Sequence, residues 1–351
     1  MGVFSSLKGI FQKRQVKKTQ LTNLNKKNII SISKDNMGSA IKSTDATCSP
    51  TTSSKQANSD AGGYNYKYSD GRRYQGHDNV SYLLPNDDDE NDRIHQQHWI
   101  LRYAFQCNFH APVTKMLEEG ITVLDSGCGP ATWTFEIGES YPRSKIYGVD
   151  ASCVFPEDIK PANVEFAIGN IAKRIPYEDS MFDYVHQRLL IGGLTHDDWK
   201  NTLKEHYRIL KPGGYVELAE VSFIDLDEAG PYMATLVKAF ETLFDSRGLR
   251  IKIGLELEDR LRQAGFENIV VKKIPLPFNH SGKIGELLWC DFQHLCINLK
   301  PALVKANPAL DGPGVFDTYL EKAAIELTLS KTYSKFFVAY AQKPKAIADK
   351  N

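Results

Sequence analysis

The segment Ile121–Ala131, with the sequence ITVLDSGCGPA, constrains the fold more than any other part of the chain. Its first four residues are largely apolar, as in a buried strand, and Asp125 ends this strand. Gly127 and Gly129 follow, and glycine allows a tight turn in which the backbone approaches a ligand closely. A helical pattern begins at Thr132. A strand, an acidic residue, a glycine turn and a helix in this order predict a site for a nucleotide-type cofactor.

The position of the acidic residue distinguishes between two kinds of cofactor. In a dinucleotide site, the glycine turn and the helix N-terminus face a pyrophosphate, which is an anion. Asp125 stands two residues before the first glycine, and its negative charge suits a cationic ligand better. S-adenosylmethionine carries an ammonium and a sulfonium group and has no phosphate. The dinucleotide fingerprint also requires Gly or Ala at the position of Thr132, so the turn favours S-adenosylmethionine.

A second strand and a second acidic residue follow in KIYGVDAS, Lys145–Ser152. Asp150 ends this strand and lies 25 residues after Asp125, which leaves room for one strand–helix–strand unit. An acid at the end of the second strand accepts both ribose hydroxyls in related folds. The alternative is an aspartate that only caps a helix.

Three further strands and a helix come in the expected order. We predict strands at Val164–Ile168, Met181–His186 and Tyr215–Ala219, and an amphipathic helix at Trp199–Leu210. Residues 211–214, with the sequence KPGG, follow that helix. Proline and glycine just past a helix stop it and turn the chain back.

Four phrases in this order resemble the motif series of class I S-adenosylmethionine-dependent methyltransferases: VLDSGCGPATW, GVDAS, FDYVHQR and HYRILKPGGYVEL. Together with YLLPNDDDENDRIHQQH, they are similar to a group of fungal methyltransferases that includes small-molecule methyltransferases and regulators of secondary metabolism. The resemblance is close over Ser81–Val221, looser to Lys343, and absent from the first 80 residues. It implies an α/β fold: a Rossmann-like seven-stranded, mostly parallel sheet with the last strand antiparallel, helices on both faces and added cap helices.

The resemblance also implies the roles of individual residues. The glycine turn with Asp125 holds the methionine part of the cofactor, Asp150 binds the ribose, Asn170 and Ile171 lie beside the adenine, and Gln187 is near the methionine part. Cys128 sits inside the turn, where packing is its expected role. The predicted cofactor-binding residues are Asp125, Gly127, Cys128, Gly129, Asp150, Ala151, Asn170, Ile171 and Gln187.

Substrate sites of open α/β folds lie beyond the carboxyl ends of the strands. His186, Gln187 and Arg188 follow the fourth strand and Glu220 follows the fifth, so we place them at this edge. His186 is the candidate general base. Its alternative role is a hydrogen bond to backbone beside the cofactor.

Two positions depart from the family pattern. Ala131 replaces the third glycine of the usual D-x-G-x-G-x-G turn, and we expect the turn to form if the backbone φ of Ala131 is negative. Asn170 replaces the usual acid after the third strand. Its side-chain oxygen can still contact the adenine amino group, although it lacks the charge.

The chain has 351 residues, enough for one large domain with extensions, and its formal net charge is zero. Residues 1–34 carry seven Lys, one Arg and no acidic residue, so the remainder is net negative. Phosphate contacts need clustered positive charge. The acidic remainder weighs against a DNA or RNA methyltransferase, and we expect no nucleic-acid partner.

The six cysteines, at positions 48, 107, 128, 153, 290 and 296, form no C-x-x-C pair. We find no secretory signal and no apolar run long enough to cross a membrane. An intracellular, cytoplasmic protein with reduced thiols is expected. The pairs His95 with His98 and His294 with Cys296 lack the three or four ligands of a metal site, so no metal is predicted.

Residues 1–80 are polar and are predicted to form a disordered tail. Tyr64, Tyr66, Tyr68 and Tyr74 alternate with polar residues near its end, which allows an edge segment, but a flexible approach to the domain is favoured. The methyltransferase domain is predicted over residues 81–345, with core motifs in 121–221 and the substrate cap and last strands in 222–343.

The first residues suggest a membrane contact. Gly2 and Ser6 match the N-myristoylation pattern, and the basic residues that follow could supply the second signal that one acyl chain needs. The alternatives are a solvated basic tail and an organelle-targeting peptide. We therefore expect a cytoplasmic protein with peripheral membrane contact, and a nuclear location is the alternative.

Further elements are predicted from helical or alternating patterns. The acid-rich run Asp87–Asp92 is interpreted as the first turn of a helix and not as a cation site, since acids favour that position. The other predicted helices are Arg93–Asn108, Pro112–Glu119, Tyr232–Phe244, Glu256–Gln263, Gly285–Leu299 and Val315–Leu329, and the other strands are Ile269–Ile274 and Phe336–Ala341.

The sequence leaves two functions open. The first is an enzyme that methylates an oxygen, nitrogen or carbon of a small metabolite. The second is a regulatory protein with a methyltransferase fold that acts through protein partners in secondary metabolism or development. The fold alone cannot separate them.

Overall fold

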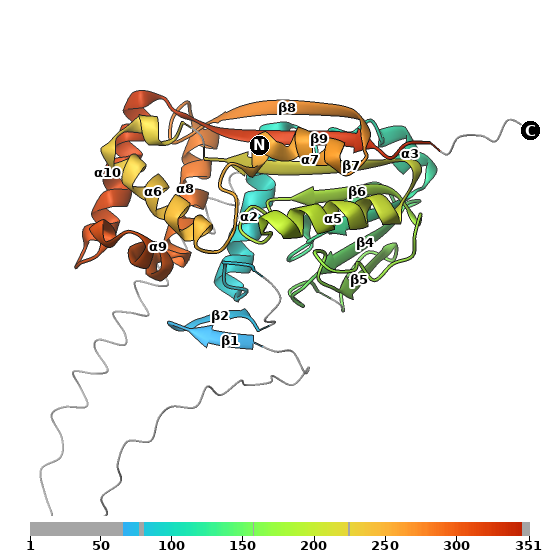
Figure 1. Cartoon of the computed structure of the whole chain (residues 1–351), viewed down its shortest axis with the longest axis horizontal. Coiled ribbons are helices and arrows are strands. Elements are labelled where there is room, and N and C mark those ends of the chain that lie inside the picture. Colours follow the sequence, from blue (N-terminus) through green and yellow to red (C-terminus); the bar gives the residue numbers. More distant parts are fainter. Residues whose placement is uncertain (1–65, 77–80, 157, 224, 346–351) are drawn as a thin grey trace, which may run out of the picture. The chain divides into compact units, whose positions relative to one another are not determined.

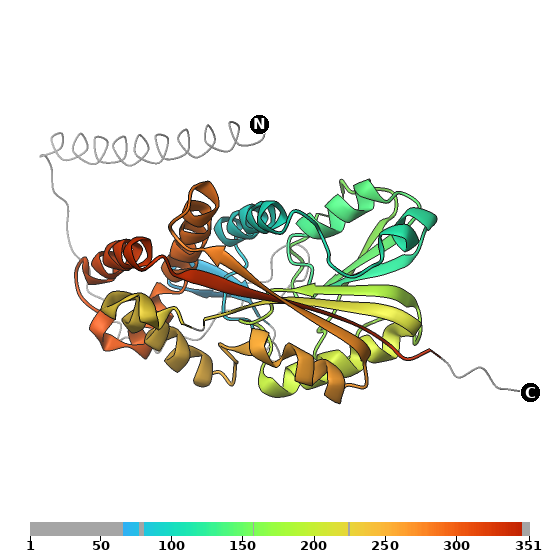
Figure 2. The same ribbon diagram turned by 90° about the horizontal axis from the view of Figure 1, so that it is seen from above.

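The structure is a computed structural model that describes residues 66–76, 81–156, 158–223 and 225–345. Within these residues, a seven-stranded sheet carries helices on both faces, and a further group of helices lies at one end of the sheet (Figures 1 and 2). The sequence predictions for residues 1–65, among them the basic tail and the acylation pattern at Gly2, lie outside the described residues. No helix in the described part is long and apolar enough to cross a membrane.

The strands of the sheet lie in the order β5-β4-β3-β6-β7-β9-β8. The first five pair in parallel, and β9 is antiparallel to both of its neighbours, which confirms the predicted sheet. Their bounds are β3 Thr122–Ser126, β4 Lys145–Asp150, β5 Val164–Ile168, β6 Phe182–Arg188, β7 Leu210–Ser222, β8 Glu267–Pro277 and β9 Tyr333–Gln342.

Consecutive residues of β3 face opposite layers, because side chains alternate along a strand. Val123 packs in one apolar cluster with Trp133 of α4, whereas Leu124 packs in another with Trp199 of α5. Both β3 residues are fully buried. A strand covered on both faces has a continuous apolar sequence, which is why Ile121–Leu124 was recognisable.

The α-helices that follow residue 110 fall into two groups. Those that cover the sheet are α3 Thr114–Glu119, α4 Thr132–Ser140, α5 His196–Ile209 and α7 Leu257–Gln263; in Figure 2, α4 lies on one face, and α5 and α7 on the other. Those at the end of the sheet form the cap: α6 Pro231–Asp245, α8 Lys283–Asn298, α9 Lys300–Ala306 and α10 Val315–Ser330. The short helix α9 follows α8 almost directly and was not predicted.

The acid-rich run forms the first turn of a helix, as predicted, but the helix ends at Phe105 and not at Asn108. α2 spans Asp88–Phe105. The side chain of Asp87 caps it by accepting a hydrogen bond from the backbone N–H of Glu90, and Asp88 and Asp89 lie in the first turn. Acidic groups there stabilise the helix dipole.

The prediction that no regular structure precedes residue 81 is wrong for residues 66–75. β1 (Tyr66–Ser69) and β2 (Arg72–Gln75) form an antiparallel hairpin, with Ser69 opposite Arg72. Asp70 and Gly71 make the turn, and both have positive φ, 51° and 74°. Asp-Gly between two alternating segments is a strong hairpin signal, so this turn was open to prediction.

The turn predicted at residues 211–214 is a bulge inside a longer strand. β7 begins at Leu210, directly after α5, and not at Tyr215. Phe182 of β6 pairs with Leu210, and Tyr184 pairs with Tyr215, so the KPGG residues loop out between two paired positions. Gly213 has a φ of 82°, a conformation that glycine adopts without strain.

Candidate active site

The glycine turn after β3 is held against the end of β4. Gly127 and Gly129 have φ of 75° and 52°. The backbone N–H groups of Gly127 and Cys128 donate to the carbonyl of Val149 at 2.8 and 3.0 Å. A Cβ on Gly127 would lie 2.8 Å from Cδ1 of Leu190, so only glycine fits there without displacement.

Asp150 fixes both the turn and its own loop. One carboxylate oxygen accepts from the N–H of Gly129 at 2.9 Å, and the other accepts from the N–H of Ser152 at 2.9 Å. Burial raises the pKa of Asp150, and these two hydrogen bonds oppose that shift. Both acids predicted from the motifs, Asp125 and Asp150, therefore lie at the same turn.

Ala131 occupies a left-handed conformation, with φ of 65° and ψ of 21°. The condition of a negative φ is not met, and the turn forms nevertheless, because Ala131 takes the backbone conformation of the glycine it replaces. The methyl group is fully buried, and the N–H of Ala131 donates to the carbonyl of Cys128 at 3.0 Å. Left-handed alanine costs roughly 1–2 kcal/mol, which the surrounding contacts must offset.

Asp125 is buried and bound on two sides. It accepts from Oγ1 of Thr134 at 2.6 Å and lies 3.3 Å from Nδ1 of His186. The His186 ring stacks on Trp133, with a centroid distance of 3.9 Å and an interplanar angle of 5°. This stacking and the contact with Asp125 fix the imidazole, whose role as a general base stays a prediction.

One cavity brings together the candidate base and all but one of the predicted cofactor-binding residues: Asp125, Gly127, Cys128, Gly129, Asp150, Ala151, Asn170, Ile171 and His186 line it. Gln187 does not. Side chains alternate along β6, so His186 and Arg188 face the cavity, and Gln187 faces the layer beneath the sheet. Gln187 is fully buried there, and neither atom of its amide has a hydrogen-bond partner among the described residues.

Asn170 lies in the cavity wall beside Ile171. Its side-chain oxygen accepts from the N–H of Ala172 at 2.9 Å, which makes a local turn. The adenine contact of Asn170 stays a prediction.

Arg188 is a cavity residue to which the sequence motifs assign no specific role. Its guanidinium lies 3.1 Å from Nδ1 of His98, and no carboxylate of a described residue is within ion-pair distance. Burial lowers the pKa of Arg188. Its position two residues after His186 on the same strand face was the available signal.

His98 links Arg188 to α4. Nε2 of His98 is 2.7 Å from Oε2 of Glu136, and Arg102 donates to the other oxygen of Glu136 at 2.9 Å. Burial raises the pKa of Glu136, but the hydrogen bonds from His98 and Arg102 outweigh it and bring the value to about 2. Glu136 is thus charged at neutral pH and holds α2 over the cofactor turn.

Glu220 was predicted to lie at the substrate edge, but it does not line the cavity. Its carboxylate oxygens accept from the N–H groups of Leu190 and Ile191 at 2.8 and 3.1 Å. Burial raises the pKa of Glu220 to about 8, against the lowering effect of these bonds. Glu220 therefore shapes the loop after β6, whose residues 189–194 do line the cavity.

Similarity to known proteins agrees with this geometry. Residues 123–214 match the family described as "Methyltransferase domain". A demethylmenaquinone methyltransferase of Anoxybacillus flavithermus is 33% identical over 180 residues, which are 44% of this chain and 74% of that protein. The chain is a class I S-adenosylmethionine-dependent methyltransferase.

Two fungal proteins are similar over a longer part of this methyltransferase. Methyltransferase pytC of Aspergillus terreus is 29% identical over 257 residues, which cover 70% of this chain and 74% of that protein. The secondary metabolism regulator LAE1 of Cochliobolus heterostrophus is 29% identical over 225 residues, which cover 60% and 70%. The predicted resemblance to fungal methyltransferases and regulators is confirmed.

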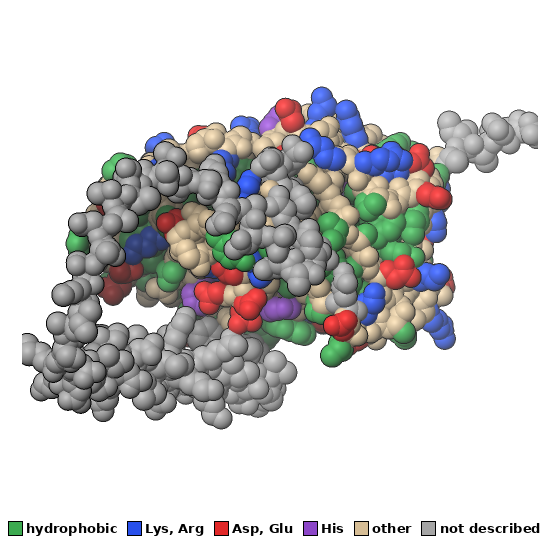
Figure 3. Space-filling model, turned by 90° about the horizontal axis from the view of Figure 1, so that it is seen from below, with side chains coloured by type: hydrophobic (Ala, Val, Ile, Leu, Met, Phe, Trp, Pro, Cys, Tyr) green, Lys and Arg blue, Asp and Glu red, His purple; other side chains and the backbone are tan. Residues whose placement is uncertain are grey.

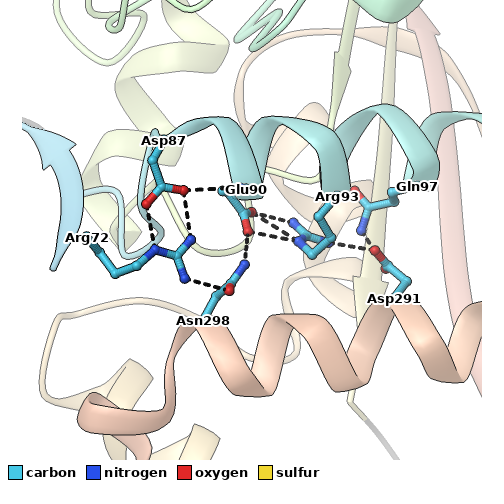
Figure 4. A network of polar contacts seen from close by, with 7 residues as sticks. All are labelled: Arg72, Asp87, Glu90, Arg93, Gln97, Asp291 and Asn298. Carbon is cyan, nitrogen blue, oxygen red and sulfur yellow. Dashed lines mark hydrogen bonds and ion pairs between the residues drawn. The ribbon is translucent and has the colours of Figure 1, made fainter. Parts of the chain in front are cut away.

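A buried polar network joins the cofactor part of the methyltransferase to its cap (Figure 4). Arg93 of α2 donates to Glu90 of the same helix at 2.6 Å and to Asp291 of α8 at 2.7 Å. Asn298 of α8 donates to Glu90 and accepts from Arg72 of β2 at 2.7 Å. α2 and the hairpin are thereby tied to α8.

The histidine and cysteine pairs considered for a metal have other surroundings. Nδ1 of His95 is 2.5 Å from Oγ1 of Thr132, and His98 pairs with Glu136. His294 is exposed, whereas Cys296 is fully buried. No group of three metal-ligating side chains occurs within the described ranges.

On the face drawn in Figure 3, several Lys and Arg side chains lie near one another at the upper edge, and elsewhere they are mixed with acidic and apolar ones. Nucleic-acid binding relies on positive charges gathered along one surface. This face offers no such stripe in the residues that it colours.

Proposed function

We propose that this methyltransferase transfers the methyl group of S-adenosylmethionine to a small metabolite bound in the cavity that the cofactor residues line. One observation carries the proposal. The same cavity that contains Asp125 and Asp150 continues between the cap helices, where Phe240 and Phe292 line it. The methyl donor and the acceptor would therefore share one cavity.

The residues around the glycine turn fit S-adenosylmethionine. The cofactor carries positive charge at its sulfonium and ammonium groups, and the carboxylates of Asp125 and Asp150 lie at the turn. Its methionine carboxylate needs a cation, and Arg188 is a buried guanidinium with free N–H groups. We assign the carboxylate to Arg188, the ribose to Asp150 and the adenine to Asn170 and Ile171.

S-adenosylmethionine, when bound, supplies a methyl group activated by the sulfonium. The chain then has to hold the acceptor atom in line with that group and exclude water. We assign the exclusion of water to α2 and to the loop at residues 189–194, which line the cavity together with the turn. His186 is held by Trp133 and Asp125. We assign it the role of general base, which removes the proton from an acceptor that must lose one.

The test is methyl transfer by the full chain. The protein is incubated with S-adenosylmethionine labelled in the methyl group and with a small-molecule extract, and labelled products are separated by chromatography. We expect a labelled metabolite that disappears with Asp150→Ala. Label found only on protein, or none in any extract, would contradict a small-metabolite acceptor.

The similarity to LAE1 supports a second candidate, a regulatory protein that acts through partners. Both functions need the cofactor site, so binding of S-adenosylmethionine does not separate them. Purification of the tagged chain from its native cells does. Stable stoichiometric protein partners, together with no metabolite methylation, would favour regulation.

The location proposal rests on the sequence pattern at Gly2 and the basic residues after it. We propose peripheral membrane contact through a myristoylated Gly2 in a cytoplasmic protein. Intact-mass analysis of the protein from its native cells measures this directly. An unmodified Gly2 would contradict the proposed membrane contact.

A further inference from the structure

The cap part of the cavity is apolar. We call it the cap chamber and define it by the lining residues that follow residue 220 in the chain. They come from β7, α6, α8, β9 and the segments between them. They are Val221, Phe223, Leu226, Phe240, Phe244, Phe278, Leu288, Asp291, Phe292, Leu295, Leu299, Ser334 and Phe336.

Aromatic rings make up much of the chamber wall. Phe292 is central, with ring centroids 5.7 Å from Phe223, 5.6 Å from Phe240 and 5.4 Å from Phe278. The contacts with Phe223 and Phe278 are edge-to-face, which fixes the rings in a favourable geometry. The wall is therefore a packed aromatic surface and not a set of loose side chains.

The chamber has two polar side chains, and only one of them is available. Asp291 is already engaged, because its two carboxylate oxygens accept from Arg93 and from Gln97 at 2.7 and 2.8 Å (Figure 4). Ser334 is 6% exposed and shares a face of β9 with Phe336. Its hydroxyl makes no hydrogen bond to another described residue. One hydroxyl in an aromatic wall can orient a ligand, but it cannot compensate a buried charge.

We infer that the methyl acceptor is an uncharged, largely hydrophobic small molecule whose body occupies the cap chamber. The inference rests on the proposed function, since it assigns the acceptor class of the same cavity. A phosphate, carboxylate or ammonium group on the body would lose its hydration, and the charged side chains at the chamber wall, Arg93 and Asp291, are already paired with each other. The heteroatom that receives the methyl group points out of the chamber toward His186, and Ser334 orients a single polar group of the body.

Two fluorescent probes with the same ring system separate shape from charge. N-phenylnaphthylamine is neutral, and anilinonaphthalene sulfonate adds one negative charge. Both are titrated into the full chain with S-adenosylhomocysteine at saturation, so that the cofactor part is filled. We expect saturable binding of the neutral probe, at least tenfold tighter than that of the sulfonate. Equal affinities, or no saturable binding of the neutral probe, would overturn the inference.

A matched pair of substitutions locates the probe. Val221→Phe fills the chamber, and Val271→Phe makes the same change on β8, where Val271 is 37% exposed and outside the cavity. We expect Val221→Phe to lower the affinity for the neutral probe at least tenfold and Val271→Phe to leave this affinity unchanged. Ser334→Leu serves as a second filling variant if Val221→Phe lowers the melting temperature. Unchanged probe affinity in a folded filling variant would place the probe elsewhere and overturn the inference.

The reaction product gives an independent check. In the labelled-methyl experiment, we expect the product to enter ethyl acetate at neutral pH. A labelled product that stays in water would contradict the hydrophobic acceptor while it supports methyl transfer to a metabolite. Absence of cofactor binding or of any labelled product would refute the proposed function, whereas the probe titrations without cofactor would still measure the chamber.

Discussion

The cofactor part and the cap chamber of this methyltransferase are built in different ways. The cofactor part is built from a glycine turn and from carboxylates at strand ends, and internal hydrogen bonds hold Asp125 and Asp150 in place. The cap chamber uses aromatic side chains from several elements and one free hydroxyl. Polar recognition depends on a few residues at fixed spacing, whereas apolar recognition depends on a surface that many dispersed residues make together.

The two parts are joined by the buried network around Arg93, and breaking it has the largest expected effect. Arg93→Ala leaves Glu90, which is fully buried, and Asp291 without their cation. Loss of one partner of a buried ion pair costs about 3–5 kcal/mol of unfolding free energy. Urea unfolding measures this loss.

Arg262→Ala is the matched control, because Arg262 pairs with Glu258 and Asp259 on an exposed helix surface. Exposed pairs contribute about 0.2–1 kcal/mol. Similar unfolding free energies for Arg93→Ala and Arg262→Ala would show that the network does not hold the cap.

The second prediction concerns the cofactor part alone. Asp150→Ala should weaken S-adenosylhomocysteine binding by about 1.5–3 kcal/mol, the contribution of a hydrogen bond to a charged group. Glu165→Ala, which removes an exposed acid from β5, is the control and should leave the affinity unchanged. Equal affinities of the two variants for S-adenosylhomocysteine would contradict the assignment of Asp150 to the cofactor site.

The third prediction is a pH dependence of stability within the cofactor part. His206 is fully buried beneath β3, where Nε2 lies 2.9 Å from Oγ of Ser126, and burial lowers its pKa to about 3. Between about pH 6.5 and pH 3 the unfolded chain binds a proton at this site and the folded chain does not, so stability falls as the solution is acidified.

His206→Gln removes this titration. Between about pH 7.5 and pH 5.5, the wild type should lose about 1 kcal/mol more unfolding free energy than the variant. Chemical unfolding at the two pH values measures the difference. Parallel losses in the two proteins would mean that His206 takes up a proton in the folded state.

The smallest expected effect is at Ala131. Ala131→Gly relieves left-handed strain of roughly 1–2 kcal/mol but loses a buried methyl group and adds chain entropy, which together cost a similar amount. Affinity for S-adenosylhomocysteine should stay within about twofold. A large gain in affinity would show that Ala131 impairs the turn.

The same contrast explains what the sequence could predict. Asp125, Gly127 and Asp150 were found because a strand end followed by glycine is a local pattern, and the structure brings them together. The motif alone places Gln187 beside the cofactor, but side chains alternate along β6, and Gln187 therefore points away from the cavity. The hairpin was missed, although Asp70-Gly71 marks its turn.

The cap chamber had no comparable signal. Phe223, Phe240, Phe292 and Phe336 lie in four separate parts of the chain, and each alone is typical of an ordinary core residue. Only the packing of β9 between β7 and β8 and the fold of the cap bring them to one wall. It was equally hidden that Arg188 has no carboxylate partner among the described residues, because a sequence does not show which charges are paired.

The most direct test of the cofactor site is calorimetric titration of the full chain with S-adenosylhomocysteine and, separately, with NAD. We predict one-to-one binding of S-adenosylhomocysteine with micromolar affinity, and no heat with NAD, since Asp125 and Asp150 disfavour a pyrophosphate at the glycine turn. Binding of NAD, or no binding of S-adenosylhomocysteine by the folded protein, would contradict this assignment.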